Sequence, residues 1–160
     1  MRIVGIDPGT RATGYGFVES AGGHTKILEV GTIEPKKTDP LKDRIHKIYN
    51  ILEQLIQQYK PDVLVLEKLY AHYKHPATSA VIGHVRGVIC LLCAKENLEL
   101  IEYSVKRIRK AVTGNGSATK MQTRRMVAHI FSLDEEKLTL DGSDALALSL
   151  GYIYMNNRKI

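Results

Sequence analysis

The sequence predicts an α/β protein with a mixed five-stranded sheet, three antiparallel strands followed by parallel strands, flanked by helices. Three strand-like segments follow one another in the first 34 residues and are joined by short turns, as in an antiparallel meander. Residues 63–66 (VLVL) form a continuous apolar run, typical of a strand buried on both faces in a parallel sheet. Segments with helical apolar periodicity precede and follow this run. At 160 residues, the chain is expected to form a single domain over residues 1–160.

The composition favours a globular protein with a polyanionic partner. Hydrophobic residues make up 44% of the chain and charged residues 25%, which is ordinary for a globular protein. We expect no membrane span and no signal peptide, and therefore a cytoplasmic protein. The net charge of +6 favours partners such as nucleic acid.

The opening residues, MRIVGIDPGT, place a carboxylate at the end of a short apolar strand. Residues 3–6 are the strand, and Asp7 follows it directly before the Pro8-Gly9 turn. An ionisable side chain at the end of a buried strand is costly without a partner, and a divalent metal ion is one such partner. Aspartate is also a common turn cap before Pro-Gly, so this stretch leaves both interpretations open.

The rest of the predicted meander consists of residues 13–19 and 26–34. Gly14 and Gly16 alternate along the first of these strands, so one of its faces carries no side chain there. This pattern allows another group to approach the backbone closely, although ordinary strand packing also explains it.

A second carboxylate is expected at the end of the next core strand. Residues 41–59 have clear helical periodicity, with Asp39 as the expected cap and Pro40 at the first helical position. The buried strand 63–66 then ends at Glu67. Ligands of open α/β sheets bind at such strand ends, while a solvated glutamate is the alternative.

The middle of the chain combines aromatic residues with an apolar helix. In the loop 69–76, Tyr70 and Tyr73 are candidates for stacking on a nucleic-acid base, or they pack locally. Residues 78–97 are expected to form a helix with a broad apolar stripe and glycines at positions 83 and 87, which suits core packing or a subunit interface. Its two cysteines, at positions 90 and 93, are interpreted as ordinary buried thiols.

The positive charge is concentrated after the fifth predicted strand, residues 98–103. Residues 106–125 contain no acidic residue and carry Lys106, Arg107, Arg109, Lys110, Lys120, Arg124 and Arg125. Residues 105–112 are expected to be a short basic helix, and a glycine-rich turn separates it from a helix over 118–131. Gly114, Gly116 and Ser117 in that turn are predicted to contact a backbone phosphate, with Ser117 as helix cap; a plain connecting turn is the alternative.

The last predicted helix begins near Asp141 and supplies two more carboxylates. Asp141 and Asp144 are three residues apart and share one face of the first turn, although capping by Asp141 also explains the pattern. Together with Asp7 and Glu67 they have the composition of a site for divalent cations, because converging carboxylates repel one another. Two such ions stabilise the attacking and leaving oxygens of a phosphodiester displacement. The residues thus indicate a metal-dependent nuclease.

Five motifs, GIDPGTRATGYG, LVLEKLYA, GHVRG, TGNGSATK and DGSDALALS, resemble in order those of the RuvC family of Holliday-junction resolvases, which has the ribonuclease H-like fold. The resemblance runs from residue 1 to about 155. It implies a crossover junction endodeoxyribonuclease that acts in DNA recombination and repair, with two Mg²⁺ per site and Mn²⁺ as a possible substitute. Asp7, Glu67, Asp141 and Asp144 match the family's catalytic metal-binding carboxylates, and Asp7 is expected to contact both ions.

The resemblance also implies partners and DNA contacts. Tyr70 matches an aromatic position that stacks on a junction base, and Arg109 and Lys120 match basic DNA-contacting positions. The helix 78–97 corresponds to the family's dimer helix, so a homodimer on a four-way junction is expected, with RuvA and RuvB as branch-migration partners. A non-catalytic junction-binding protein and a related nuclease acting on RNA are the alternatives.

Overall fold

The computed structural model describes residues 1–68 and 76–156. Its elements, in chain order, are β1 (Arg2–Asp7), β2 (Thr13–Ala21), β3 (His24–Ile33), α1 (Leu41–Tyr59), β4 (Val63–Glu67), α2 (Pro76–Lys95), β5 (Glu99–Tyr103), α3 (Val105–Thr113), α4 (Lys120–Phe131), a 3₁₀ turn η1 (Glu135–Lys137) and α5 (Leu140–Asn156). Every predicted strand and helix is present, with ends that differ from the expected ones by a few residues.

The five strands form one mixed sheet in the order β3-β2-β1-β4-β5. Strands β1, β2 and β3 pair antiparallel through short turns, and β4 and β5 pair parallel to β1 and β4 respectively. Gly22 and Gly23, both with positive φ, form the turn between β2 and β3, a conformation that glycine adopts without steric cost. The predicted fold class is therefore confirmed.

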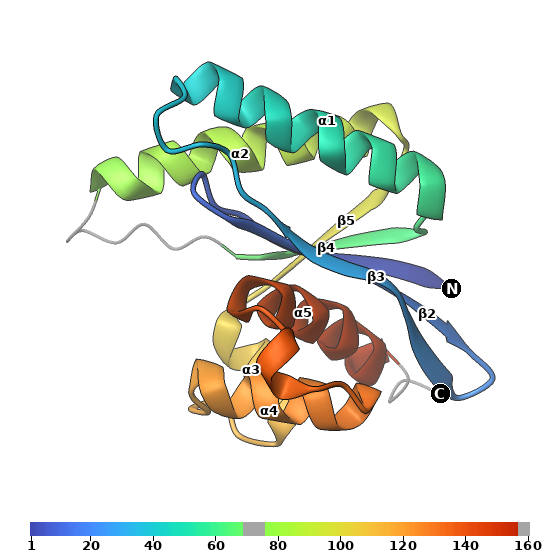
Figure 1. Cartoon of the computed structure of the whole chain (residues 1–160). Helices are drawn as coiled ribbons and strands as arrows, with labels where there is room; N and C mark the ends of the chain where they lie inside the picture. The colour runs from blue at the N-terminus through green and yellow to red at the C-terminus, as the bar shows by residue number, and fades with distance from the viewer. Residues whose placement is uncertain (69–75, 157–160) are drawn as a thin grey trace.

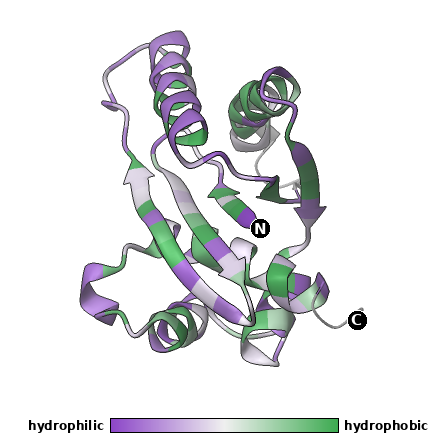
Figure 2. Ribbon diagram, turned by 90° about the vertical axis from the view of Figure 1, so that its right-hand side faces the viewer, coloured by the Kyte–Doolittle hydropathy of each residue, from purple (hydrophilic) through white to green (hydrophobic). Residues whose placement is uncertain are grey.

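Helices cover both faces of this sheet. Helices α1 and α2 lie on one face, and α3, α4 and α5 lie on the other (Figure 1). Hydrophobic residues of the strands lie between the two helical layers (Figure 2). Side chains alternate along β1, since Ile3 joins the core under α5 whereas Val4 and Ile6 join the core under α1 and α2.

The helix caps differ from the predicted ones. Pro40 occupies the N-cap of α1 without a side-chain hydrogen bond, so Asp39 is not the cap residue. Helix α4 begins two residues later than expected, and Thr119, not Ser117, caps it in a capping box with Gln122. The hydroxyl of Thr139 accepts a hydrogen bond from the Gly142 amide at the start of α5, which leaves Asp141 free of a capping role.

Helix α2 is more apolar and more exposed than a typical core helix. Its segment Thr78–Lys95 has the length and apolar composition of a membrane-spanning helix, which the sequence was not expected to contain. A single helix of this kind is weak evidence for a membrane span, since core helices can have the same composition. Val85, Ile89 and Leu92 are buried against α1 and the sheet, whereas Leu91 is 57% exposed. Cys93 is buried but Cys90 is exposed, so the prediction of two buried thiols holds for only one of them.

Candidate active site

Asp7 and Glu67 are neighbours because the two strands that carry them are paired. Ile6 pairs with Leu66 in the parallel β1–β4 ladder, so the next residue of each strand is a carboxylate at the same edge of the sheet. The alternation of side chains turns both toward the α3–α5 layer, the face to which Ile3 and Val65 also point. The two strand-end acids thus share one edge and one face.

Helix α5 reaches these acids because glycines on β1 and β2 leave room for its backbone. A Cβ atom at Gly5 would lie 2.0 Å from the carbonyl oxygen of Ala145, and one at Gly14 would lie 2.0 Å from that of Asp141. The buried Ser149 hydroxyl donates to the Gly16 carbonyl at 2.9 Å. The close approach expected from the alternating glycines is therefore made by α5, which brings its acidic first turn to the strand ends.

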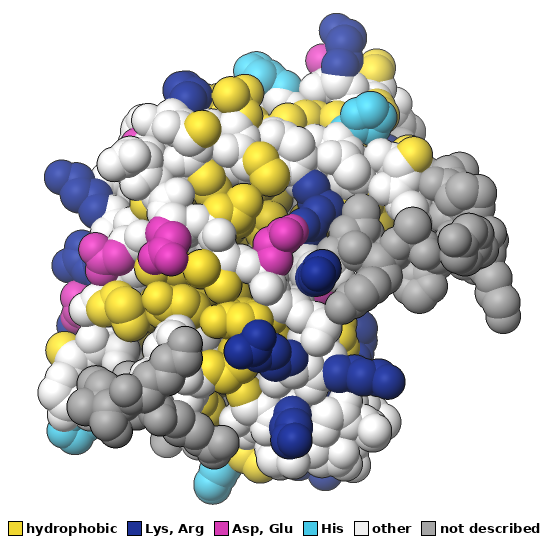
Figure 3. All heavy atoms as spheres, turned by 180° about the vertical axis from the view of Figure 1, so that it is seen from behind, with side chains coloured by type: hydrophobic (Ala, Val, Ile, Leu, Met, Phe, Trp, Pro, Cys, Tyr) yellow, Lys and Arg dark blue, Asp and Glu magenta, His cyan; other side chains and the backbone are white. Residues whose placement is uncertain are grey.

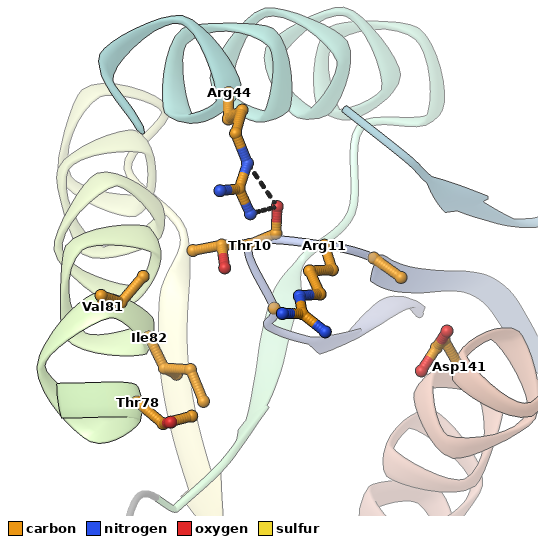
Figure 4. A pocket seen from close by; sticks show the side chains of 9 residues that line it. Thr10, Arg11, Arg44, Thr78, Val81, Ile82 and Asp141 are labelled. Atoms are coloured by element: carbon orange, nitrogen blue, oxygen red, sulfur yellow. Dashed lines mark hydrogen bonds between the residues drawn. The ribbon is translucent and has the colours of Figure 1, made fainter. Parts of the chain in front are cut away.

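These elements enclose a cavity of about 300 Å³, called the carboxylate pocket below. It is lined by Asp7, Glu67, Val105, Ile108, Arg109, Lys120, Thr123, Asp144, Ala147 and Leu148. Three of the four predicted acids and two of the predicted basic residues therefore meet in one pocket. The fourth acid, Asp141, lines a neighbouring groove (Figure 4).

Crowding of the carboxylates makes the pocket electrostatically strained. Burial, with the charges of Asp144 and Glu67, raises the pKa of Asp7 from 3.8 to about 7. Burial and the charge of Asp144 also raise the pKa of Glu67, while Lys120, Arg109 and Arg86 oppose that shift. A cation in the pocket would relieve this repulsion.

Lys120 supplies part of the missing positive charge. Its ammonium group donates to Asp144 Oδ2 at 2.6 Å. Burial alone would lower the pKa of Lys120, but this hydrogen bond and the charges of Asp144, Asp7 and Asp141 raise it overall. Lys120 is thus the cation that the pocket holds next to Asp144.

The donor set fits a hard divalent cation, because carboxylate oxygens are the ligands that Mg²⁺ and Mn²⁺ prefer. Over residues 1–68 and 76–156, no three His, Cys, Asp or Glu side chains lie close enough to ligate a single ion in this arrangement. In this arrangement Asp144 is instead paired with Lys120.

The predicted DNA-contacting residues have different surroundings. Lys106 and Lys110 are exposed on α3, and Arg109 lines the carboxylate pocket. Arg107 instead stacks on the Tyr103 ring at 4.7 Å and donates to Met155 Sδ. Several Lys and Arg side chains gather near acidic side chains on the face seen in Figure 3.

Two other predicted DNA-contacting residues, Arg124 and Ser117, make hydrogen bonds within the chain. Arg124 donates to the Glu135 carbonyl and so connects η1 to α4, and its Nε atom is buried without a hydrogen-bond partner.

In the glycine-rich turn between α3 and α4, the Ser117 amide donates to Asn115 Oδ1 at 2.9 Å. Gly114, with a positive φ, ends α3, and Gly116 packs near the Lys106 carbonyl. Contacts of this turn with phosphate stay a prediction. Tyr70 and Tyr73 lie outside the described residues.

Arg86 was not among the predicted site residues, although it is part of the GHVRG motif. The guanidinium group of this α2 residue donates to the backbone carbonyl of Glu67 and to the Glu102 carboxylate, and its side chain is only 13% exposed. Arg86 therefore ties the end of the Glu67 strand to α2. The sequence signal for this role is the position of Arg86, an arginine within a largely apolar helix.

Known proteins of one family are similar to this chain over nearly its whole length. Residues 3–152 match the family model described as crossover junction endodeoxyribonuclease RuvC. Relatives of that name from Rhodopirellula baltica and Petrotoga mobilis are 35% and 41% identical, and the matches cover 99% and 92% of this chain and 89% and 90% of theirs. The structure of Thermus thermophilus RuvC in complex with a Holliday junction substrate superposes with a TM-score of 0.90 at 22% identity, covering 99% of this chain and 96% of that one.

The structural likeness establishes the ribonuclease H-like fold, and the sequence match establishes the family. The chain therefore belongs to the RuvC family of crossover junction endodeoxyribonucleases.

Proposed function

We propose that this protein resolves four-way DNA junctions by paired symmetric nicks in recombination and repair, leaving 5′-phosphate and 3′-hydroxyl ends. The observation that carries this proposal is the meeting of Asp7, Glu67 and Asp144 with Arg109 and Lys120 in one pocket of a RuvC-family chain. Carboxylates alone would repel a phosphodiester, whereas carboxylates with bound cations and flanking basic groups attract it.

Membership of this nuclease family implies a divalent metal cofactor. We propose two Mg²⁺ per site, with Mn²⁺ as a substitute, held by Asp7, Glu67 and Asp144 with Asp141 at the margin. When bound, the metal would activate water for in-line attack and stabilise the leaving 3′ oxygen. The raised pKa values of Asp7 and Glu67 support this proposal, because burial and neighbouring acids disfavour their charged forms, which a bound cation would stabilise.

The basic residues of the pocket are proposed to hold the scissile phosphate. Lys120 reaches Asp144 from the first turn of α4, and Arg109 lines the same pocket from α3. A phosphate placed between them would compete with Asp144 for the Lys120 ammonium group. Lys106 and Lys110, exposed on α3, would then contact phosphates farther along the strand.

Cleavage of a mobile synthetic four-way junction tests the proposed activity. With Mg²⁺ we expect paired nicks in strands of the same polarity, and with chelator we expect none. Asp7→Asn should bind the junction and fail to cut it, whereas Asp134→Asn, in an exposed acid that caps η1, should cut at the wild-type rate. Asn serves as well as Asp at an N-cap, so this control keeps the fold.

Three outcomes would contradict the proposal. Binding without metal-dependent nicking would indicate a non-catalytic junction-binding protein. Preferential cleavage of RNA would indicate a related ribonuclease H-like enzyme. Near wild-type nicking by Asp7→Asn would show that the active site is elsewhere.

We further propose a homodimer that pairs through α2, so that two active sites face one junction. Gly83 and Gly87 have open space where a Cβ would stand, and Leu91 is exposed one helical turn farther along. This stripe of small and apolar groups allows a second helix to approach closely. Each copy of Arg86 would then connect that interface to the Glu67 end of β4.

Sedimentation velocity of two matched variants tests the homodimer. Leu91→Glu should give a monomer, because a charge would be buried at the interface. Leu133→Glu replaces another exposed leucine, 38% exposed and outside α2, and should leave the dimer intact. Equal dimer fractions in both variants would rule out pairing through α2.

Loading by RuvA and RuvB and action in the cytoplasm are also proposed from family membership. Stimulation of nicking when purified RuvA and RuvB are added to a junction would support the first of these. Fractionation of cells that express the protein would test the second.

A further inference from the structure

A second concave region lies directly beside the carboxylate pocket. This groove, called the Arg11 groove below, has a volume of about 650 Å³. It is lined by Gly9, Thr10, Arg11, Ala12, Arg44, Thr78, Val81, Ile82 and Asp141. Asp141 also acts through its charge on Asp7 and Lys120, so the groove adjoins the carboxylate pocket.

The loop that forms one wall of this groove is held by internal hydrogen bonds. The buried Thr13 hydroxyl donates to the Gly9 carbonyl at 2.6 Å and accepts from the Gly9 amide at 3.3 Å. Arg44, on α1, donates through Nε and Nη2 to the Thr10 carbonyl (Figure 4). Arg11 lies between Thr10 and Thr13, whose hydrogen bonds hold the loop backbone in place.

Arg11 itself is left without a protein partner. In the part of the chain that the structure describes, its guanidinium group makes no hydrogen bond or ion pair, and the residue is exposed. Figure 4 shows the guanidinium group in the space between α2 and Asp141. A planar group with five donors in a fixed fork, held at the rim of a groove, is suited to a phosphate.

We propose that the Arg11 groove binds the backbone of the cleaved DNA strand next to the scissile phosphate, and that Arg11 clamps one flanking phosphate. This inference rests on the proposed function. Lys120 and Arg109 supply positive charge from the α3–α4 side of the carboxylate pocket, and Arg11 supplies it from the opposite, β1–β2 side. A DNA strand that crosses the carboxylate pocket would then meet positively charged side chains on both sides of it.

The other groove residues fit a sugar-phosphate backbone. Val81 and Ile82 offer apolar surface to deoxyribose, and the hydroxyl groups of Thr10 and Thr78 lie at the rim (Figure 4). Contacts of this kind position the strand without reading its bases, so the groove should act equally on all junction sequences. Arg44 acts on the strand only through the loop and is a positioning residue.

The salt dependence of junction binding in chelator tests the clamp. Each phosphate neutralised by a protein cation contributes about 0.9 to the slope of log K against log salt. Arg11→Gln should reduce that slope by about 1 and weaken binding on the order of 10-fold, equally for junctions of different sequence. Arg11→Lys should keep most of the slope, because it keeps the charge.

Lys26→Gln is the matched control. It also removes one exposed positive charge, but Lys26 pairs with Glu19 at the opposite end of the sheet and should leave the slope unchanged. An Arg11→Gln slope equal to that of wild type, or a loss of slope as large in Lys26→Gln, would overturn the proposal.

Uncharged methylphosphonates, placed singly on either side of the cleavage position, identify the clamped phosphate. For the wild type, one of these replacements should weaken binding by the same factor as Arg11→Gln. Combined with Arg11→Gln, that replacement should cost nothing more, because both changes remove the same contact. Independent losses at every position would refute a specific clamp.

Failure of the inference can be told apart from failure of the proposed function. Wild-type nicking with an unchanged Arg11→Gln slope rejects the clamp and keeps the resolvase. Absence of wild-type nicking rejects the resolvase, while the binding slopes still decide whether Arg11 contacts a phosphate.

Discussion

Replacing Asp7 with asparagine should stabilise the metal-free protein while removing its proposed activity. Burial and the charges of Asp144 and Glu67 raise the pKa of Asp7 in the carboxylate pocket from 3.8 to about 7. Asparagine has nearly the same shape and carries no charge. The substitution therefore removes the repulsion without opening a cavity.

The size and pH dependence of this effect follow from the two pKa values. Below pH 3.8 the acid is protonated in both folded and unfolded chains and costs nothing. Between 3.8 and about 7 only the unfolded chain releases the proton, so the stability of the wild type falls as pH rises. Above about 7 the penalty is complete and amounts to up to about 4 kcal/mol, at 1.36 kcal/mol per pH unit.

Thermal unfolding in chelator, scanned from pH 4 to pH 9, measures the difference. Since 1 kcal/mol shifts Tm by about 2–4 °C in a chain of this length, Asp7→Asn should unfold on the order of 10 °C higher than wild type at pH 8 and at about the same temperature at pH 4. Asp134→Asn, in an acid outside the pocket, should match the wild type across the scan.

Addition of Mg²⁺ provides a second measurement on the same samples. A cation that binds the folded wild type raises its Tm by mass action, and the gain should be smaller for Asp7→Asn. An asparagine variant whose advantage at pH 8 is no greater than at pH 4 would refute the electrostatic reasoning. An equal Mg²⁺ gain in both proteins would refute Asp7 as a ligand.

Three further predictions concern how the site is held in place. Gly14→Ala should lower the free energy of unfolding by more than about 3 kcal/mol in chemical denaturation, because its Cβ would meet the Asp141 carbonyl oxygen at 2.0 Å and displace α5. Arg86→Lys should lower kcat for junction nicking about 10-fold with KM unchanged. Lysine lacks the planar fork with which Arg86 bridges the Glu67 carbonyl and the Glu102 carboxylate. A parallel rise in KM would contradict a positioning role. Thr119→Ala should cost about 1 kcal/mol in the same denaturation assay, because it removes the cap of α4, and an unchanged midpoint would show that the capping box contributes little.

Much of the fold could be predicted because its signals are local. Apolar periodicity distinguishes helix from strand within a short window, and Gly-Gly or Pro-Gly turns separate the elements. The same locality explains the errors. Caps depend on where a helix begins, so a two-residue shift in the start of α4 moved the cap from Ser117 to Thr119.

The acids could likewise be selected from the sequence, since Asp7 and Glu67 end apolar strands and Asp144 lies near the start of an apolar helix. Their types and positions were sufficient to predict a site for divalent cations, and the five motifs were sufficient to predict the family.

How these residues meet depends on the tertiary structure. The pairing of Ile6 with Leu66 brings two strand ends together, and the glycine face of β1 and β2 admits α5 beside them. In the folded chain Asp141 lies at the boundary between the carboxylate pocket and the Arg11 groove, and Arg11 has no partner among the described residues. Strand register joins β1 to β4, and close packing joins β1 and β2 to α5, which lies more than a hundred residues farther along the chain. Such long-range contacts leave no local pattern from which they could be predicted.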